Sequence, residues 1–334
     1  MREGDLEDLR ALLDLDEPTW PALLAFLIGA LNPHGPYFCL LVEGEQGSGK
    51  SFICSLIKKT LDPNAVEKLR LPKNEHDLMI QASQNHLLIF DNASNLRWDM
   101  SDALCALSTG SGFSVRQLYT DNESRTFHFA RPFIINGIGD FAHRPDLLER
   151  AIPLHLEAMP RHKRKPERQL LAEFDRLLPG VLGCLCNIIS CALANLDKVE
   201  APNTIRMADA AQWLVAAETA TGLQGGAFLK TLEAGQKSLL VDRVLDDVLV
   251  QALMEITEKR PFTDTVGKLF TKVQDYVGDY KGSHLPRTPA HLSTALKRLR
   301  PALAKIGLHV RFANKTRKGR MVHLELDDDV GVNL

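Results

Sequence analysis

The feature that most constrains the fold of this chain is a glycine-rich stretch that begins at Gly44 and reads GEQGSGKS. It fits the pattern GxxxxGK[ST] at every fixed position. The apolar run 37–43 precedes it, and a helical pattern from Lys50 to about Leu61 follows. Strand, glycine-rich turn and helix in this order predict a loop that wraps phosphate groups, because the loop amides and the helix N-terminus point at negative charge.

The residue types in this stretch predict ATP and Mg²⁺ as cofactors. Lys50 is expected to reach the β- and γ-phosphates, and Ser51 is expected to bind Mg²⁺ through its hydroxyl group. The other residues expected to contact ATP surround these two side chains, and they are Gly44, Glu45, Gln46, Gly47, Ser48, Gly49 and Phe52. The alternative, a chance glycine-rich turn, does not explain why a strand and a helix flank it.

A second apolar run ends in a carboxylate. Residues 87–94 read LLIFDNAS, so a buried strand ends at Asp91, 41 positions after Lys50. A carboxylate at that place is expected to hold the Mg²⁺ shell, whereas a strand that merely ends in Asp is the alternative. Many ATPases of this shape place a glutamate next, and here Asn92 cannot accept a proton at neutral pH. We expect Asn92 to orient the attacking water, and the sequence does not identify the general base.

Three further polar residues are expected around the γ-phosphate. Asn136 ends the apolar run 131–136, where its amide is placed to bind the γ-phosphate and the attacking water. Arg144 and Arg150 flank a short helix, from which a guanidinium is expected to reach the nucleotide of a neighbouring subunit. The alternatives are an asparagine that turns the chain, and surface arginines that pair with Asp146 or Glu149.

The alternation of strands and helices predicts an α/β fold with a parallel sheet. We expect a helical N-terminal segment at 1–36, the α/β core at 37–160, a helical subdomain at 161–260 and a third domain at 261–334. In the core, strands are expected at 65–71, at 113–119 and at 125–129, and a helix with Asn74 as its N-cap is expected at 74–84. Helical periodicity covers 5–31 and 166–256, with breaks expected at Pro179-Gly180, Pro202-Asn203 and Gly225-Gly226.

Composition adds limits on the class of protein. Of 334 residues, 45% are hydrophobic and 25% are charged, as in soluble globular proteins. The six cysteines form no CxxC pair or zinc pattern, and we expect buried free thiols in a reducing cytoplasm. The first ten residues are too acidic for a signal peptide. The apolar stretches 20–31 and 181–196 are expected to be buried helices, so we expect a cytoplasmic protein with no membrane segment.

The C-terminal part is strongly basic although the whole chain has a net charge of −2. Between Lys281 and Leu324 there are eleven Lys and Arg and no Asp or Glu. A helix at 264–278, a helix capped by Thr288 and a hairpin of 308–313 with 320–326 predict a winged helix that binds DNA. The expected contacts are Lys297, Arg298, Arg300, Lys315, Arg317, Lys318 and Arg320. The alternative is a solvated basic face used for subunit packing.

Five stretches occur in an order that resembles one family. GEQGSGKS, IFDNAS, SDALCALSTGSGFSVRQLYTD, RPFIINGIGDFAHRPDLLERAI and IRMADAAQW together look like the ATPase module of phage- and plasmid-type primase-helicases. These are AAA+ P-loop proteins close to the superfamily 3 helicases. The resemblance extends from about Trp20 to about Phe228. It implies a hexameric ring that hydrolyses ATP at subunit interfaces and pulls one DNA strand through its channel.

The resemblance gives roles to residues at matching positions. Gly44–Ser51 resembles the Walker A loop, Asp91 the Walker B aspartate and Asn136 the sensor-1 residue. Arg150, with Arg144 as the second candidate, resembles the arginine finger. The hairpin at 113–129 resembles a loop that faces the channel, and its expected DNA contacts are Arg116, Tyr119 and Arg125. A solvent-facing hairpin is the alternative.

The predicted function is therefore a DNA motor, the replicative helicase of a phage, plasmid or other mobile element. Only about 36 residues precede the first strand, too few for a priming domain, so we expect a stand-alone motor or a fragment, with a primase possible in trans. One alternative is an ATP-driven loader or remodeller. Another is a DNA-bound regulatory or defence module that uses ATP only to assemble. Ring size, polarity and origin sequence do not follow from the sequence.

Overall fold

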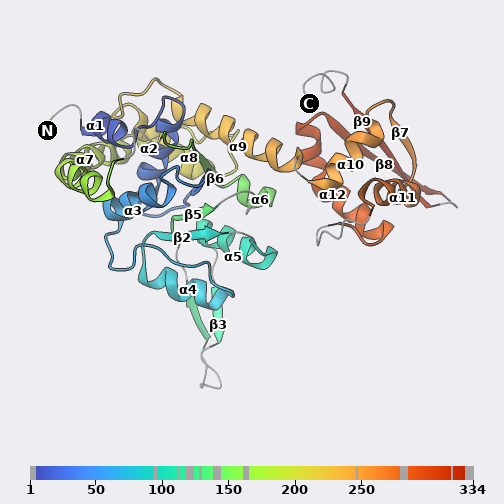
Figure 1. Cartoon of the computed structure of the whole chain (residues 1–334), viewed down its shortest axis with the longest axis horizontal. Coiled ribbons are helices and arrows are strands. Elements are labelled where there is room, and N and C mark those ends of the chain that lie inside the picture. Colours follow the sequence, from blue (N-terminus) through green and yellow to red (C-terminus); the bar gives the residue numbers. More distant parts are fainter. Residues whose placement is uncertain are drawn as a thin grey trace. The chain divides into compact units, whose positions relative to one another are not determined.

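The chain divides into two compact units in the computed structural model, Met1–Gln236 (unit 1) and Lys237–Leu334 (unit 2). The structure describes residues 5–93, 96–110, 113–116, 124–127, 130–137, 144–160, 165–245, 247–278, 285–316 and 319–327. At 5, 113–116, 124–127 and 314–316 it describes the backbone only. Figure 1 labels the helices and strands of both units.

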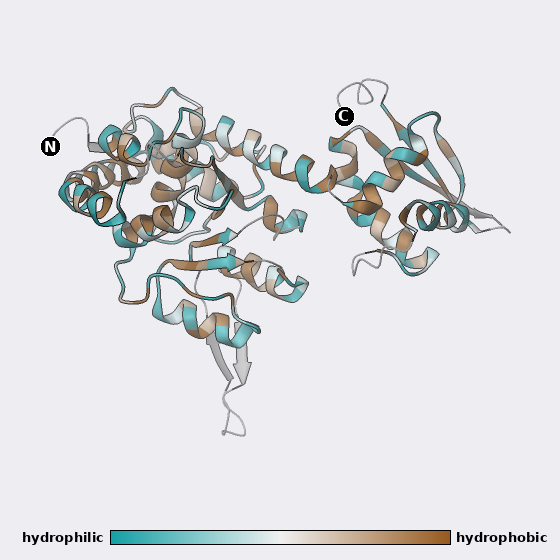
Figure 2. Ribbon diagram, in the orientation of Figure 1, coloured by the Kyte–Doolittle hydropathy of each residue, from teal (hydrophilic) through white to brown (hydrophobic). Residues whose placement is uncertain are grey.

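A four-stranded parallel sheet forms the centre of unit 1, in the order β2-β5-β1-β6. Its strands are buried on both faces, as apolar runs flanked by helices should be, and Figure 2 colours much of β2 and β5 as hydrophobic. The predicted parallel sheet is thereby confirmed. The strands are β1 (Cys39–Gly44), β2 (Leu88–Ala93), β5 (Phe133–Gly137) and β6 (Ala151–Leu156).

Segment 65–71, expected to be a full strand, contributes only a bridge to the sheet edge beside β2. The backbone N–H of Leu69 donates to the carbonyl of Ile89 at 2.7 Å, and the N–H of Asp91 donates to the carbonyl of Leu69 at 3.0 Å. Two hydrogen bonds bring residues 68–70 alongside the end of β2. Lys68 and Arg70 therefore lie near Asp91, a position that no pattern in the sequence predicts.

Helices cover both faces of the sheet. Leu40 and Val42 of β1 pack in one core with residues of α2, α3, α7 and α8. Strand residues alternate between faces, so Leu41, which is also fully buried, belongs to the other face. Just before β1, the backbone N–H of Tyr37 donates to the carbonyl of Ser108 in α5 at 2.8 Å. The helices before α7 are α1 (Asp5–Leu12), α2 (Thr19–Ala30), α3 (Lys50–Leu61), α4 (Glu75–Gln84), α5 (Trp98–Thr109) and α6 (Pro145–Leu148).

The N-terminal helical segment is two helices rather than the continuous one expected over 5–31. Asp14, at φ 51, and Pro18 lie between α1 and α2, and both oppose continuation of an α-helix. The N-cap expected at Asn74 is confirmed, since its side chain accepts from the backbone N–H of Asp77 at 2.8 Å. Side-chain capping is a local interaction, which is why the sequence identifies it.

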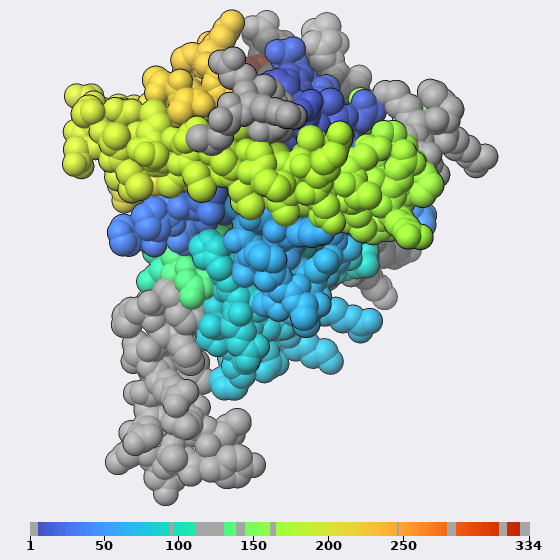
Figure 3. All heavy atoms as spheres, turned by 90° about the vertical axis from the view of Figure 1, so that its left-hand side faces the viewer, coloured from blue at the N-terminus to red at the C-terminus, as the bar shows by residue number. Residues whose placement is uncertain are grey.

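The helical subdomain consists of α7 (Glu167–Asn195), the 3₁₀ turn η2 (Leu196–Lys198), α8 (Ala208–Glu218) and α9 (Ala227–Leu245). The break expected at Pro179-Gly180 is wrong, because α7 continues through both residues. Figure 3 shows α7 as one helix across a face of unit 1. Burial of Phe174, Val181 and Leu185 on both sides of the proline holds the helix to the core and offsets the lost backbone hydrogen bond.

The expectation that 181–196 is a buried helix holds for only one side of α7. Ile188 is 1% exposed, whereas Leu182 is 40% and Leu193 is 59% exposed. Among the described residues, Glu167–Lys198 is the one helical stretch whose length and apolar composition are sufficient to cross a membrane, a test that core helices of soluble proteins also pass. The buried side of α7 packs against α1 and α8.

The six cysteines, all described by the structure, form no disulfide with one another, but the expectation that they are buried is correct only in part. Cys39 and Cys54 are buried, and burial raises the pKa of the Cys54 thiol to about 12. Cys186 is exposed, and the remaining three are half-buried. In α7, Cys184 and Cys191 are about two helical turns apart and share one side of the helix, whereas Cys186 lies on the opposite side.

The predicted hairpin of unit 1 is confirmed in its strands, β3 (Phe113–Arg116) and β4 (Ser124–Phe127). They pair antiparallel, with Arg116 opposite Ser124 and Val115 opposite Arg125. The side chains of Arg116 and Arg125, and all of Tyr119, lie outside the described residues.

In its described residues, unit 2 contains the second half of α9, three further helices and an antiparallel sheet of order β7-β9-β8. Residues 262–265, expected to begin a helix at 264, instead form β7, which pairs with β9. Thr265 then caps α11 by accepting from the N–H of Lys268 at 3.3 Å. The expected cap at Thr288 is confirmed. The elements are α10 (Val248–Thr257), β7 (Phe262–Thr265), α11 (Val266–Val277), α12 (Pro289–Lys305), β8 (Leu308–Thr316) and β9 (Gly319–Leu326).

Candidate functional site

The glycine-rich loop connects the end of β1 to the start of α3, as the sequence predicts. Gly44 has φ 147, and a Cβ there would lie 2.2 Å from the carbonyl oxygen of Leu156 and 2.9 Å from Ser48 Oγ. Gly49 has φ 83 and forms the N-cap of α3. Neither backbone position suits a residue with a side chain. The loop conformation therefore depends on glycine at both ends.

Lys50 lies inside this loop. Its side chain is held by the loop itself, because Nζ donates to the carbonyl oxygens of Gly44 at 2.6 Å and Glu45 at 2.7 Å. The residue is 8% exposed. Neutral carbonyls are weaker partners for an ammonium group than phosphate oxygens are. A bound phosphate can therefore replace them, and the geometry suits an anion above the N-terminus of α3.

Ser51, at the start of α3, meets Asp91 and Asn136 near the carboxyl ends of β2 and β5, and we call these three residues the edge site. Ser51 Oγ donates to Asp91 Oδ1 at 3.2 Å. Asn136 Nδ2 lies 2.5 Å from the same Oδ1 and 3.2 Å from Ser51 Oγ. The pairing of Asn136 with Val42 places the amide beside the end of β1. Three side chains that are far apart in sequence thus form one cluster.

The donor set of the edge site fits a magnesium ion. Hydroxyl and carboxylate oxygens are the ligands that Mg²⁺ takes from proteins, which usually supply one or two of them. Asn136 is 2% exposed, and its Oδ1 has no hydrogen-bond partner in the part of the chain that the structure describes. That oxygen can therefore accept a hydrogen bond from a bound group. No group of three or more His, Cys, Asp or Glu that could hold a metal occurs among the described residues.

Asn92 has an unusual backbone. Its φ is 55, in the left-handed region, and the register between β2 and β5 shifts between Phe90 and Ala93. Such a bulge bends a strand and re-aims a side chain. Asparagine tolerates the left-handed region much better than glutamate does. The backbone therefore favours asparagine at this position, which the sequence alone did not explain.

Arg144 and Arg150 both contact their own subunit around α6. Arg144 pairs with Asp102 and with Asp146, the latter at 3.3 Å, and its guanidinium lies 5.3 Å from the centre of the Trp98 ring. Arg150 Nη1 donates to the carbonyl of Asp146 at 2.6 Å. Arg150 Nε is buried and has no partner among the described residues.

Arg206, which the sequence did not single out, connects the helical subdomain to α6. Its Nη1 lies 2.7 Å from Asp146 Oδ1 and 2.7 Å from Glu149 Oε2. The hydrogen bond from Arg206 holds the pKa of Asp146 below its ordinary value. Asp146 is therefore a common partner of Arg144, Arg150 and Arg206.

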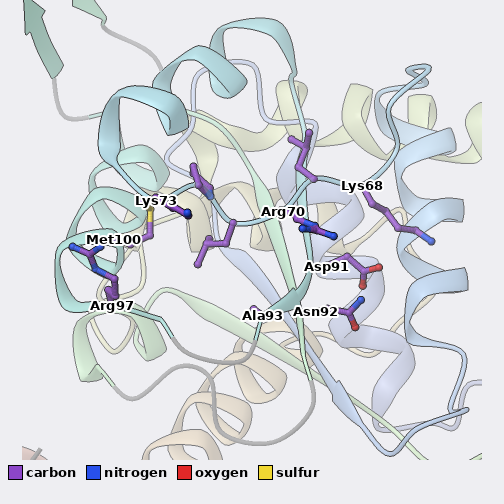
Figure 4. Close-up of a pocket in the computed structure, with 11 residues that line it drawn as sticks. Lys68, Arg70, Lys73, Asp91, Asn92, Ala93, Arg97 and Met100 are labelled. Atoms are coloured by element: carbon purple, nitrogen blue, oxygen red, sulfur yellow. The ribbon is translucent and has the colours of Figure 1, made fainter. Parts of the chain in front are cut away.

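A cavity of about 610 Å³ opens beside Asp91, on the side of the Leu69 bridge (Figure 4). The sequence did not identify it. The one sequence signal for this pocket is the alternation of cations and apolar residues in KLRLPK, residues 68–73. It falls partly in the stretch that was predicted to be a strand. We call the cavity the cationic pocket, and its lining includes Lys68, Arg70, Lys73, Asp91, Asn92 and Arg97.

The basic residues of unit 2 lie on α12 and on the β8–β9 hairpin. Lys297, Arg298 and Arg300 are exposed on α12, on the side away from buried Leu292, Leu296 and Leu299. Lys297 Nζ lies 5.8 Å, and the guanidinium of exposed Arg320 5.9 Å, from the centre of the Phe312 ring. The side chain of Lys315, and all of Arg317 and Lys318, lie outside the described residues.

Two family models match this chain. The model of one family, described as actinomycete integrative conjugative element replication protein, matches residues 12–242. A second model, for the C-terminal domain of the same replication proteins, matches residues 248–330. A search of curated proteins gave no match.

Solved structures of the NrS-1 C-terminal region are similar at low identity. The A-form apo structure is 13% identical with a TM-score of 0.41, and the match covers 98% of this chain and 76% of that chain. A further apo structure is 11% identical with a TM-score of 0.40 over the same shares. The family models together span most of both units. The chain belongs to the replication proteins of actinomycete integrative conjugative elements.

Proposed function

We propose that this replication protein is an ATP-dependent DNA motor, the replicative helicase of its mobile element. The observation that carries the proposal is the edge site beside the glycine-rich loop. Ser51, Asp91 and Asn136 lie within hydrogen-bond distance of one another. Lys50 lies inside the loop at the start of α3. This combination suits one purpose, which is to hold a nucleoside triphosphate with its metal.

The loop residues Gly44–Ser51 would act as a phosphate-binding loop. Lys50 would leave the carbonyls of Gly44 and Glu45 and bind the β- and γ-phosphates. Ser51 and Asp91 would hold Mg²⁺, directly or through water. When bound, MgATP supplies the phosphoryl group whose transfer to water drives the motor. Phe52 is only half-buried and packs against the core, so its expected contact with ATP also stays a proposal.

Asn136 and Asn92 would handle the attacking water. Asn136 has a free acceptor at Oδ1, which can take a hydrogen bond from water while Nδ2 stays on Asp91. Asn92 points into the space beside Asp91 in Figure 4. Neither amide is a base, so they would position the water, and electrostatic stabilisation of the transferring group would supply most of the rate.

Two substitutions separate the amide of Asn92 from its backbone. Asn92→Gly keeps the left-handed conformation and removes the amide, whereas Asn92→Ala also strains the backbone by about 1 kcal/mol. We expect both variants to lose ATP turnover to a similar extent and only the alanine variant to unfold at a lower temperature. Steady-state hydrolysis and thermal unfolding measure the two effects. Undiminished turnover of the glycine variant would refute a role for the amide.

The assembly would be a homo-hexameric ring that encloses one DNA strand. In such a ring Arg150, or Arg144, would leave its intrasubunit contacts to reach the nucleotide of the next subunit. The hairpin of β3 and β4 would present Arg116, Tyr119 and Arg125 to the strand. The ring, its hexameric size and a primase that acts in trans rest on the family resemblance of the motifs.

Unit 2 would be a winged-helix domain that binds DNA. Three helices with a small antiparallel sheet, and exposed cations on α12 and β9, support this assignment. The charges face the solvent although Leu292, Leu296 and Leu299 hold the same helix in the core. A basic surface supported in this way gives affinity for phosphates that falls with salt.

Charge removal from α12 tests the role of unit 2. Lys297→Ala/Arg300→Ala should weaken binding to duplex DNA and lower the slope of log affinity against log salt by about 1.8, since each phosphate contact contributes about 0.9. Lys259→Ala/Arg260→Ala is the matched control, because these two exposed cations of unit 2 lie between α10 and β7 and not on α12. Fluorescence anisotropy at several KCl concentrations measures the slopes. Equal slopes in the two variants would contradict the assignment.

Strand displacement tests the proposed function as a whole. Forked DNA with a defined 3′ or 5′ tail should be separated by the full chain only when ATP and Mg²⁺ are present, and one tail should be preferred. ATP turnover that DNA stimulates without strand separation would instead favour the loader or remodeller. No turnover with nucleotide-dependent assembly would favour a regulatory or defence module.

A further inference from the structure

We propose that the cationic pocket binds phosphate groups of a single-stranded nucleic acid. The inference rests on the proposed motor function, because it gives that motor a strand contact next to its hydrolysis site. The pocket carries four cationic side chains and one carboxylate, Asp91 (Figure 4). Its four cations are Lys68, Arg70, Lys73 and Arg97.

The fold brings these cations together from two elements. The bridge at Leu69 fixes the segment 68–73 beside the end of β2, and residues 68 and 70 therefore point to the same side of the chain. Arg97 comes from the N-terminus of α5, where its side chain also pairs with Asp99 at 2.5 Å. Arg70 and Lys73 are exposed, and among the described residues that line the pocket the one carboxylate is Asp91.

The pocket adjoins the proposed nucleotide site, with which it shares Asp91 and Asn92. None of the loop residues 44–51 lines it, so its cations are additional to those of the phosphate loop. A cavity of about 610 Å³ extends from Asp91 to Arg97 and Met100, which is far more than one phosphate requires. Cations at both ends suit a chain of phosphates that enters from outside. A nucleic-acid strand has that chemistry, as does the triphosphate tail of a free nucleotide.

The pocket shares two residues with the proposed hydrolysis site, so strand binding should affect ATP turnover. Asp91 and Asn92 line the pocket and also belong to the proposed hydrolysis site. A strand phosphate beside Arg70 would change the electrostatic environment of both residues. Binding of the strand should therefore alter ATP turnover, in addition to its effect on affinity.

The test uses the full chain with Arg70→Ala/Lys73→Ala. Its matched control is Arg168→Ala/Lys198→Ala, which removes two exposed cations from α7 and η2 of the same unit. Labelled oligodeoxythymidylate is titrated by anisotropy at several KCl concentrations. We expect the pocket variant to bind about 25-fold more weakly at 0.1 M salt, with the salt slope lower by about 1.4, because single strands contribute about 0.7 for each phosphate. The control should follow the unaltered protein.

Two further measurements make the result decisive. A fluorescent ATP analogue and inorganic tripolyphosphate should bind the pocket variant as tightly as the unaltered protein. Stimulation of ATP turnover by the oligonucleotide should be lost in that variant. The single variants Arg70→Gln and Lys73→Gln are measured in case the double variant misfolds. Each should show half the change in salt slope, because each removes one phosphate contact.

Two outcomes would overturn the inference. An unchanged salt slope would show that no strand phosphate binds there. Weaker binding of tripolyphosphate with unchanged oligonucleotide binding would assign the pocket to the nucleotide instead. Failure of the proposed motor function has a different signature, because it abolishes turnover or strand separation in the unaltered protein and leaves the anisotropy comparison intact.

Discussion

Lys50→Ala should reduce ATP turnover by about 1,000-fold, the size of effect expected when one preorganised donor to a transition-state oxygen is removed. The ammonium group donates to the carbonyls of Gly44 and Glu45, and its contact with Ser48 Oγ, at 3.5 Å, is longer. Loss of these two hydrogen bonds should cost about 1–3 kcal/mol of stability, which leaves the unit folded. Steady-state hydrolysis measures the loss of ATP turnover, and thermal unfolding measures the loss of stability.

Lys59→Ala is the control for that experiment. Lys59 lies on the same helix, and its partner is Asp175 at the surface. The variant removes the same charge from α3, but exposed ion pairs contribute little to stability. Turnover should stay unchanged. If Lys50→Ala and Lys59→Ala behaved alike, the loop would not be the nucleotide site.

Arg150→Ala should lower turnover by about 1,000-fold or more while nucleotide affinity stays close to that of the unaltered protein. An arginine supplied to a transferring phosphoryl group acts in the transition state and contributes effects of this size. Mixing this variant with Asp91→Ala should restore part of the activity. In a mixed ring, a subunit with intact Asp91 then receives Arg150 from its neighbour.

Arg206→Ala distinguishes that role from support of α6. Arg206 holds Asp146 and Glu149, so its loss disturbs the same turn that Arg150 holds through the carbonyl of Asp146. We expect lower stability but no recovery on mixing with Asp91→Ala. If the Arg150→Ala mixture also failed to recover, Arg150 would act only within its own subunit.

An asparagine follows Asp91 at the position where many ATPases have the glutamate that activates the attacking water. The sequence identified an asparagine where a glutamate is common, and it gave no reason. The left-handed φ of Asn92, at the bulge between Phe90 and Ala93, gives a backbone reason for the residue type. What the amide does for catalysis is a separate matter, which the comparison of glycine and alanine at this position decides.

Some features of this protein are determined by the sequence itself, because they depend on neighbours along the chain. The loop from Gly44 to Ser51, the helix that follows it and the caps at Asn74 and Thr288 are of this kind. Each needs only a few consecutive residues of suitable type. The parallel sheet also followed from the alternation of apolar runs and helical patterns.

Other features were decided only by tertiary structure, because they depend on residues far apart in sequence. The edge site exists because β5 lies between β2 and β1, an order that local patterns do not encode. The helix through Pro179 exists because its apolar side is held by the core. The cationic pocket exists because a two-hydrogen-bond bridge brings Lys68 and Arg70 to Asp91. Long-range packing outweighs local preference at each of these places.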